Sequence, residues 1–169
     1  GISQRFDISE YFPVPTRRKY PFKSIIGELL WMLSGSTNIN DLETKYNSKI
    51  WSPWRSKEFE QKNRYVDGAI GPGYGFQIRD ASGQYFGGLK KTYPYIGQID
   101  QLQRIVRLLK TEPHRRDIMW NLYSPGQVDK MRLPPCHFAA QFLVYEDTLD
   151  CVLYQRSADF PLGVPANII

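Results

Sequence analysis

The feature that most restricts the fold of this chain is an apolar helix predicted over residues 21–33. A proline suits its first turn, and Gly35 is placed to end it. One stripe of this helix consists of large apolar side chains, namely Phe22, Ile25, Ile26, Leu29, Leu30 and Leu33. Because Gly27 and Trp31 lie on the opposite side, we expect burial on two sides. Glu28 lies between these faces and is not expected to be simply solvated.

Two more helices and a long connection are expected after this helix. Asn38 is a good N-cap for a second, short helix. A third helix is predicted over residues 98–110, where apolar residues share one face, and Glu112-Pro113 ends it. Residues 51–96 are rich in glycine, tyrosine and charge, and we expect them to be mostly loop.

The remainder of the chain has the pattern of a β-sheet. A strand is predicted over residues 117–123 and a hairpin over residues 137–145 and 149–157, with its turn at 146–148. The order of extended segment, helices, loop and sheet indicates an α+β fold in one domain, residues 1–169.

Charge and hydropathy exclude some classes of protein. The net charge of +5, from 22 Lys+Arg against 17 Asp+Glu, suits an anionic ligand, although a solvated basic surface would give the same value. No apolar run has the length of a membrane span and no signal peptide opens the chain, so we expect a cytoplasmic protein without a membrane partner. Two cysteines, Cys136 and Cys151, do not make a disulfide framework.

Cys136 is the candidate nucleophile. It lies in Leu133-Pro134-Pro135-Cys136-His137, where the prolines hold the thiol at the start of a predicted strand. A thiolate at neutral pH needs a nearby cation, which Arg156 on the second strand of the hairpin could supply. The alternative is a buried inert cysteine, which is our interpretation of Cys151. His137 is either a general base or a structural histidine bonded to the backbone.

Three other groups could bind or present a ligand. Arg115-Arg116 follows a proline in a turn, and paired arginines can clamp a phosphate, although a solvated surface is the alternative. Asn167 can donate and accept hydrogen bonds at once, which suits the N3–H and O4 of a uracil edge. Gly71–Gly75 lacks the Lys-Ser/Thr of a phosphate loop. We interpret it as a tight turn, with no helix after it, that presents Tyr74.

Six separated blocks occur in the order in which one enzyme family carries them. They are Ser24-Ile25-Ile26-Gly27-Glu28-Leu29-Leu30-Trp31, Ile50-Trp51-Ser52-Pro53-Trp54, Gly71-Pro72-Gly73-Tyr74-Gly75, Arg115-Arg116, Pro135-Cys136-His137 and Gln155-Arg156-Ser157 through Asn167. On these blocks the chain resembles the thymidylate synthase family. The resemblance implies helices packed against a mixed β-sheet and a sheet-mediated homodimer. It also implies that an N-terminal segment and a C-terminal third of the family pattern are missing.

The resemblance further implies a reaction and a set of site residues. The reaction is reductive methylation of dUMP to dTMP with 5,10-methylenetetrahydrofolate as co-substrate, without a metal, through a bond between a cysteine and C6 of the base. The implied catalytic residues are Cys136, Glu28, Arg156, Tyr74 and His137. The implied dUMP contacts are Arg115, Arg116, Arg156, Ser157, Asp159 and Asn167, with Arg115 and Arg116 reaching the partner subunit's site. The implied folate contacts are Ile50, Trp51, Trp54, Leu133, Asp159 and Gly163.

Departures from the family pattern keep a second outcome open. Ala166 replaces a usual Phe, Ile78 replaces the Trp of a Gln-Trp-Arg motif, and Pro21 replaces a common His. Similar enzymes that hydroxymethylate pyrimidine nucleotides use the same adduct but hydrate the exocyclic methylene instead of reducing it, so 5-hydroxymethylation is the alternative. A nucleic-acid-binding module and an inactive remnant are further hypotheses. The chain has no recognition helix, zinc site or RNP-like strand, so a nucleic acid partner is not expected.

Overall fold

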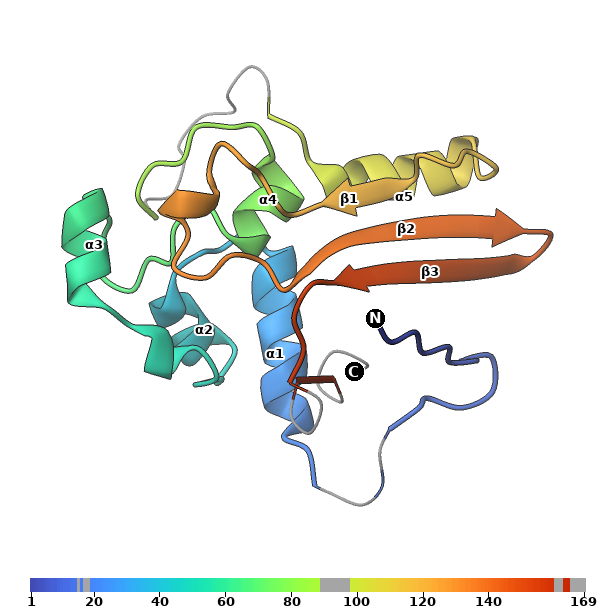
Figure 1. Ribbon diagram of the computed structural model, residues 1–169, viewed down its shortest axis with the longest axis horizontal. Helices are drawn as coiled ribbons and strands as arrows, with labels where there is room; N and C mark the ends of the chain where they lie inside the picture. Colours follow the sequence, from blue (N-terminus) through green and yellow to red (C-terminus); the bar gives the residue numbers. More distant parts are fainter. Residues whose placement is uncertain (15, 17–18, 89–97, 160–162, 165–169) are drawn as a thin grey trace.

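The computed structural model describes residues 1–14, 16, 19–88, 98–159 and 163–164. The elements are α1 (Phe22–Leu33), α2 (Ile39–Lys45), the 3₁₀ turn η1 (Ser52–Trp54), α3 (Lys57–Asn63), α4 (Tyr74–Asp80), α5 (Gln101–Thr111), β1 (Met119–Asn121), the 3₁₀ turn η2 (Val128–Lys130), β2 (His137–Tyr145) and β3 (Thr148–Gln155). Figure 1 shows α1 to α4 gathered at one end of the long β2–β3 hairpin, with α5 lying along β1. The predicted α+β class is confirmed.

The described strands form a three-stranded sheet in the order β1-β2-β3. The β2–β3 pairing runs from His137 opposite Gln155 to Tyr145 opposite Thr148, which confirms the predicted hairpin. Both pairings are antiparallel. The expectation of a mixed sheet is therefore wrong for the described residues. A two-residue turn between β2 and β3 can only produce an antiparallel pair.

Helix α1 begins and ends as predicted, but it is buried on one side only. Gly27 and Trp31 are on the buried side, and a Cβ added to Gly27 would lie 2.7 Å from the carbonyl oxygen of Tyr46. Because Gly27 has no side chain, the segment after α2 can approach α1 closely. The stripe of large apolar residues on the other side remains 39–48% exposed at Phe22, Ile26, Leu29 and Leu30. Burial on two sides is thus not observed among the described residues.

Residues 51–96 are expected to be mostly loop, and most of the described residues 51–88 do lie outside regular elements. Helices α3 and α4 and the turn η1, which were not predicted, also lie in this stretch. Ser56 caps α3 by accepting a hydrogen bond from the N–H of Phe59, at 3.2 Å. Helix α4 follows Gly73 directly, so a helix does come after the glycine-rich turn. Each of these helices has only seven residues, too few to be stable without packing, and α4 is stabilised by burying Tyr74 and Ile78.

Two apolar clusters hold these elements together. The larger one joins α1, α2, α4 and the turn at η1 through Trp31, Met32, Ile39, Leu42, Trp51, Ile70, Tyr74, Ile78 and Leu122. The smaller one packs Ile105 and Leu108 of α5 against Ile118, next to Trp120 and Phe142 of the sheet. The larger cluster therefore lies at the end of the hairpin where β2 begins and β3 ends.

Candidate active site

Cys136 immediately precedes β2 and is half-buried. Its backbone N–H donates to the hydroxyl oxygen of Tyr74 at 2.8 Å. Its carbonyl oxygen accepts from the backbone N–H of Arg156 at 2.9 Å. The cysteine backbone is thus attached to α4 on one side and to the end of β3 on the other, which fixes where the thiol can lie.

The guanidinium of Arg156 lies beside the sulfur. Its Nη2 is 3.8 Å from Cys136 Sγ. Nε donates to the carbonyl of Pro135 at 2.9 Å, and Nη2 donates to the carbonyl of Pro134 at 2.8 Å. Neither proline has an N–H, but each carbonyl still needs a donor. The two carbonyls orient the guanidinium, so a fixed positive charge lies next to the thiol, as the sequence predicts.

Tyr74 is the centre of a chain of aromatic contacts. Its ring stacks on that of His137 with centroids 4.6 Å apart, and it meets the edge of Trp51 at 6.2 Å. Burial raises the pKa of Tyr74 well above its ordinary value of 10.0, so its hydroxyl stays protonated and can still donate a hydrogen bond. Burial also lowers the pKa of His137 below 6.5, which favours the neutral ring.

Glu28 joins this chain of contacts through Trp51. The indole Nε1–H of Trp51 donates to Glu28 Oε1 at 2.6 Å. Burial raises the pKa of Glu28 above its ordinary value of 4.5, and the hydrogen bond from Trp51 opposes that rise. A carboxyl group balanced in this way can take up and release a proton closer to neutral pH than an exposed glutamate can.

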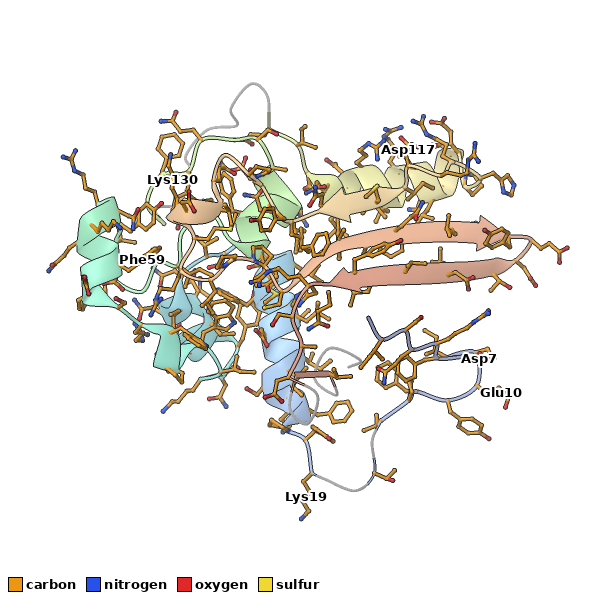
Figure 2. The ribbon with its side chains drawn as sticks, in the orientation of Figure 1. Asp7, Glu10, Lys19, Phe59, Asp117 and Lys130 are labelled. Carbon is orange, nitrogen blue, oxygen red and sulfur yellow. The ribbon has the colours of Figure 1, made fainter. Side chains whose placement is uncertain are left out.

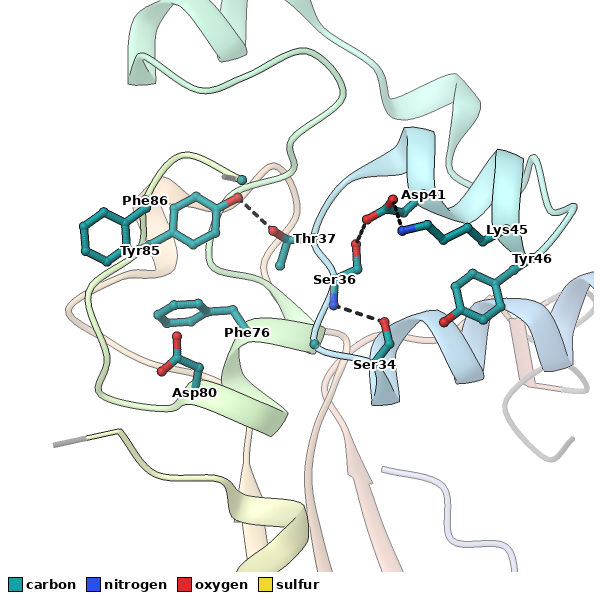
Figure 3. Close-up of a pocket in the computed structure, with 12 residues that line it drawn as sticks. Ser34, Ser36, Thr37, Asp41, Lys45, Tyr46, Phe76, Asp80, Tyr85 and Phe86 are labelled. Carbon is teal, nitrogen blue, oxygen red and sulfur yellow. Dashed lines mark hydrogen bonds and ion pairs between the residues drawn. The ribbon is translucent and has the colours of Figure 1, made fainter. Parts of the chain in front are cut away.

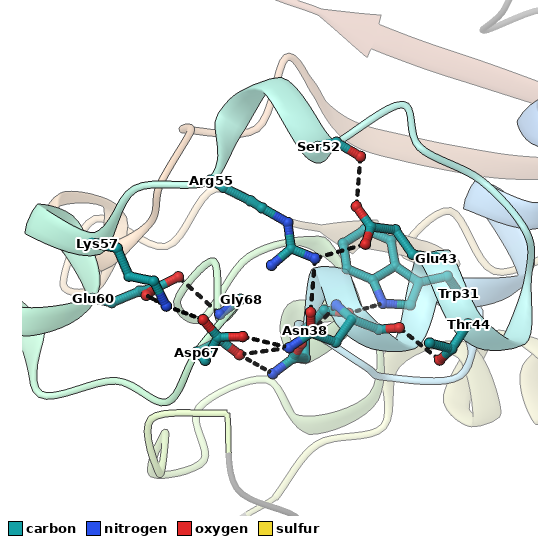
Figure 4. Close-up of polar contacts among 11 residues, drawn as sticks. Trp31, Asn38, Glu43, Thr44, Ser52, Arg55, Lys57, Glu60, Asp67 and Gly68 are labelled. Atoms are coloured by element: carbon teal, nitrogen blue, oxygen red, sulfur yellow. Dashed lines mark hydrogen bonds and ion pairs between the residues drawn. The ribbon is translucent and has the colours of Figure 1, made fainter.

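A network of polar contacts holds the segment that carries Trp51. Ser52 donates from Oγ to Glu43 Oε1 at 2.6 Å. Arg55 donates from Nη2 to Glu43 Oε2 at 2.8 Å and to Asn40 Oδ1 at 2.7 Å. Figure 4 shows these bonds tying η1 and the residue after it to α2. Trp51 is therefore anchored by its neighbours as well as by its own burial.

The remaining residues predicted at the site lie in several places. Leu133 packs against the cluster that contains Trp51 and Tyr74. Ile50 lies two residues before η1 and Trp54 is its last residue, and they are 40% and 44% exposed. Ser157 follows Arg156, and its carbonyl accepts a hydrogen bond from Gln155. The N–H of Gly163 donates to the carbonyl of Asp159 at 2.8 Å. Asn167 lies outside the described residues.

Arg115 and Arg116 are not brought to Cys136 within this chain. Both are exposed in the connection between α5 and β1. The carbonyl of Arg116 accepts from the side chain of Gln141 at 2.7 Å. Gln141 is five residues beyond Cys136 along β2, which is about 16 Å at the rise of a strand. The described chain therefore separates the arginine pair from the thiol.

One cavity lies apart from this site. It has a volume of about 350 Å³ and is lined by residues of α2, α4, the segment after α1 and the loop near Tyr85, including Ser36, Lys45 and Phe76 (Figure 3). None of its lining residues belongs to the predicted site. Within the described part of the chain there is no cluster of three His, Cys, Asp or Glu side chains that could hold a metal ion. No helix among these residues is long and apolar enough to cross a membrane.

Two connections at the site were not predicted from the sequence. The bond from Trp51 to Glu28 joins residues that were assigned to different ligands, and the bond from Cys136 to Tyr74 joins residues 62 positions apart. A buried indole N–H and a half-buried carboxylate both need partners, so matching these needs could have suggested the first bond. The second has no local signal in the sequence.

The sequence is similar to those of known proteins along its whole length. Residues 1–169 match the family model described as thymidylate synthase. The chain is 40% and 39% identical to the bifunctional dihydrofolate reductase-thymidylate synthases of Plasmodium chabaudi and Plasmodium berghei, covering 99% of this chain but 29% of each of those proteins. It is 39% identical to the thymidylate synthase of Homo sapiens over 99% of this chain and 54% of that protein. The chain thus spans about half of the human enzyme and less than a third of the bifunctional ones. With the family model matching every residue, the chain belongs to the thymidylate synthase family.

Proposed function

We propose that this protein converts dUMP to dTMP by reductive methylation, with 5,10-methylenetetrahydrofolate as co-substrate. The observation that carries the proposal is the contact of Cys136 Sγ with Arg156 Nη2 at 3.8 Å, in a network that continues through Tyr74 and Trp51 to Glu28. A cation beside a cysteine favours the thiolate, which is the nucleophilic form.

The proposed reaction begins when the sulfur of Cys136 forms a bond to C6 of the uracil ring, leaving an enolate that is nucleophilic at C5. C5 then forms a bond to the methylene carbon of the co-substrate and loses its proton, and the folate amine leaves. A hydride from the reduced pterin passes to the exocyclic methylene as the thiolate departs from C6. The products are dTMP and dihydrofolate, so the folate supplies both the carbon and the electrons.

The protein groups have distinct proposed tasks in these steps. Glu28, whose pKa is raised by burial, exchanges protons with the base through water. Tyr74 fixes the backbone of Cys136 and, by stacking, the ring of His137. Arg156 stabilises the developing negative charge and, with Ser157, binds the phosphate.

The remaining ligand contacts follow from the family pattern. Asn167 reads the base, and Asp159 lies between the nucleotide and the pterin. The folate pocket is proposed to be lined by Ile50, Trp51, Trp54, Leu133 and Gly163. Trp54 is exposed and lies close in sequence to Trp51, which is buried. This supports the proposal, because a flat ligand needs an aromatic surface that it can reach.

We also infer that the protein acts as a homodimer in which Arg115 and Arg116 bind the phosphate in the partner subunit's site. Their distance from Cys136 along β2 supports a role in trans. The exposed apolar side chains of β3 support a contact through the sheet, because Leu149, Leu153 and Tyr154 are 44–53% exposed. Sedimentation equilibrium of the full-length protein tests this, and a monomer at micromolar concentration would refute it.

A second outcome, 5-hydroxymethylation of the nucleotide, is favoured by one observation. Ile78 occupies a buried position, 3% exposed, where the family pattern has Trp, and it packs in the cluster that contains Trp51 and Tyr74. A smaller side chain there changes the packing behind the site. In this outcome water adds to the exocyclic methylene and tetrahydrofolate, not dihydrofolate, is released.

One experiment tests the covalent step and a second separates the two outcomes. Full-length protein incubated with 5-fluoro-dUMP and methylenetetrahydrofolate should gain covalent mass on the peptide that contains Cys136. The Cys136→Ala variant should gain none, while Cys151→Ala should label like the unchanged protein. Absence of label from the unchanged protein would refute the proposal. With dUMP as substrate, growth of dihydrofolate absorbance indicates methylation, and a hydroxymethyl nucleotide without it indicates the second outcome.

A further inference from the structure

Asp117 follows the arginine pair directly and forms the centre of a compact group of charges. Arg115 donates from Nε to Asp117 Oδ1 and from Nη2 to Asp117 Oδ2, both at 2.8 Å. Arg104 of α5 donates from Nη2 to the same Oδ2 at 2.7 Å, and from Nη1 to the carbonyl of Asp117 at 3.0 Å. Asp117 therefore connects Arg115 to α5 through Arg104.

The geometry leaves donors of Arg115 available for an anion. Arg115 also donates from Nη1 to Glu112 Oε2 at 3.0 Å, so each of its three nitrogens makes one bond to a carboxylate. A guanidinium has five N–H groups, two on each Nη and one on Nε. One N–H on each Nη remains, and the side chain is 43% exposed. An arginine that keeps an N–H on each Nη can donate two hydrogen bonds to a phosphate.

The neighbouring Arg116 is held differently. Its carbonyl is fixed by Gln141, but no hydrogen bond or ion pair joins its guanidinium to another of the described residues. Arg104, Arg115 and Arg116 carry three positive charges, against two negative charges on Glu112 and Asp117. The group therefore keeps a net charge of +1. Because this net charge is positive, the group does not repel an anion despite its two carboxylates. Its arginines hold the pKa of Asp117 well below its usual range, so these charges persist across neutral pH.

We propose that Asp117 is a positioning residue for nucleotide binding. It holds the guanidinium of Arg115 in place before the arginine pair binds the nucleotide phosphate in the partner subunit's site. This inference rests on the proposed function. Ordering a long exposed side chain costs free energy at the moment of binding, and a bidentate carboxylate removes much of that cost beforehand. Figure 2 shows Asp117 next to α5.

The Asp117→Asn change in the full-length protein tests the inference, because it keeps the shape and removes the charge. We expect the KM for dUMP to rise about 2- to 12-fold, the range set by the entropy of ordering one long side chain, with kcat changed less than about twofold. Asp117→Glu, which keeps the charge, should recover most of the KM. An unchanged KM would refute the positioning role, and a lowered KM would show that Asp117 competes with the phosphate.

Mixed dimers separate positioning in trans from a structural effect. In the first, a chain carrying both Cys136→Ala and Asp117→Asn is paired with an unchanged chain, so the single remaining Cys136 faces the altered arginine pair of its partner. In the second, a Cys136→Ala chain is paired with an Asp117→Asn chain, so the single remaining Cys136 faces the unaltered arginine pair of its partner.

We expect a raised KM in the first mixed dimer and an ordinary KM in the second. An equal KM in both would overturn the inference, since a structural effect of Asp117 within its own chain would raise the KM of the second. Failure of the unchanged protein to turn over dUMP at all would instead refute the proposed function, so the two failures are distinguishable.

Discussion

Replacing Trp51 with Phe tests whether the indole N–H controls the protonation of Glu28. The change removes the donor that lies 2.6 Å from Glu28 Oε1 but keeps an aromatic ring against Trp31 and Tyr74. A hydrogen bond to a charged group contributes about 1.5–3 kcal/mol. Its loss should therefore raise the proton affinity of Glu28 by a factor of about 10 to 150. The pKa of Glu28, already raised by burial, should move further upward.

This change also predicts how stability depends on pH. A carboxyl group whose pKa is higher in the folded state than in the unfolded state costs stability when it ionises, so stability falls as pH rises from its unfolded pKa to its folded pKa. Without the Trp51 donor this cost is larger. We therefore expect Trp51→Phe to lower the free energy of unfolding more at pH 7.5 than at pH 4.5, by up to about 3 kcal/mol. The loss of packing at Trp51 adds equally at both pH values and cancels in the comparison.

Urea unfolding of the chain at the two pH values measures this difference, and NMR of ¹³C-labelled glutamate carboxyl groups follows the titration directly. Glu28→Gln identifies the resonance and should remove the pH-dependent part of the effect in the double variant with Trp51→Phe. The matched control is Trp54→Phe, because Trp54 is 44% exposed and only its backbone forms the hydrogen bonds observed. An equal loss of stability at both pH values, or a Glu28 titration that does not move upward, would refute the reasoning.

Three further changes test the surroundings of the site. Tyr74→Phe leaves the N–H of Cys136 without its acceptor and should lower the free energy of unfolding by about 1–3 kcal/mol in urea, and no loss would show that the bond is dispensable. Gly75→Ala would place a Cβ 2.4 Å from the carbonyl oxygen of Ser36, so we expect a loss of about 1–3 kcal/mol or more by thermal unfolding, and an unchanged midpoint would contradict the close packing of α4. Because burial lowers the pKa of His137, the unfolded state binds the extra proton, and stability should fall as pH drops below about 6.5. His137→Gln should flatten this dependence, and an unaltered slope would assign it to other groups.

The sequence predicts the parts of this structure that depend on local chemistry. The Asn38 cap, the ends of α1 and the β2–β3 hairpin follow from capping residues and from alternation, and the structure agrees. The contact of Cys136 with Arg156 was also predictable, because a hairpin brings the start of its first strand to the end of its second.

What could not be predicted depends on contacts between distant segments. Helices α3 and α4 are short and contain or follow residues typical of loops, so only packing makes them helical. Burial of α1 on two sides was predicted wrongly, because apolar content does not reveal which face meets α2 and α4. The role of Asp117 as a bidentate partner of Arg115 depends on the shape of one turn, although opposite charges two residues apart were visible in the sequence.

The attachment of Cys136 to Tyr74 has a consequence for how the protein acquires its reactivity. The bonds that define the thiol's surroundings join residues 20, 23 and 62 positions apart. When two residues lie far apart in the sequence, the entropy of loop closure is lost before their contact contributes any stabilisation. A nascent or damaged chain that has not docked α4 and closed the hairpin lacks both the bond from Cys136 to Tyr74 and the guanidinium beside the sulfur. The surroundings proposed for the nucleophile therefore exist only in molecules that have completed folding.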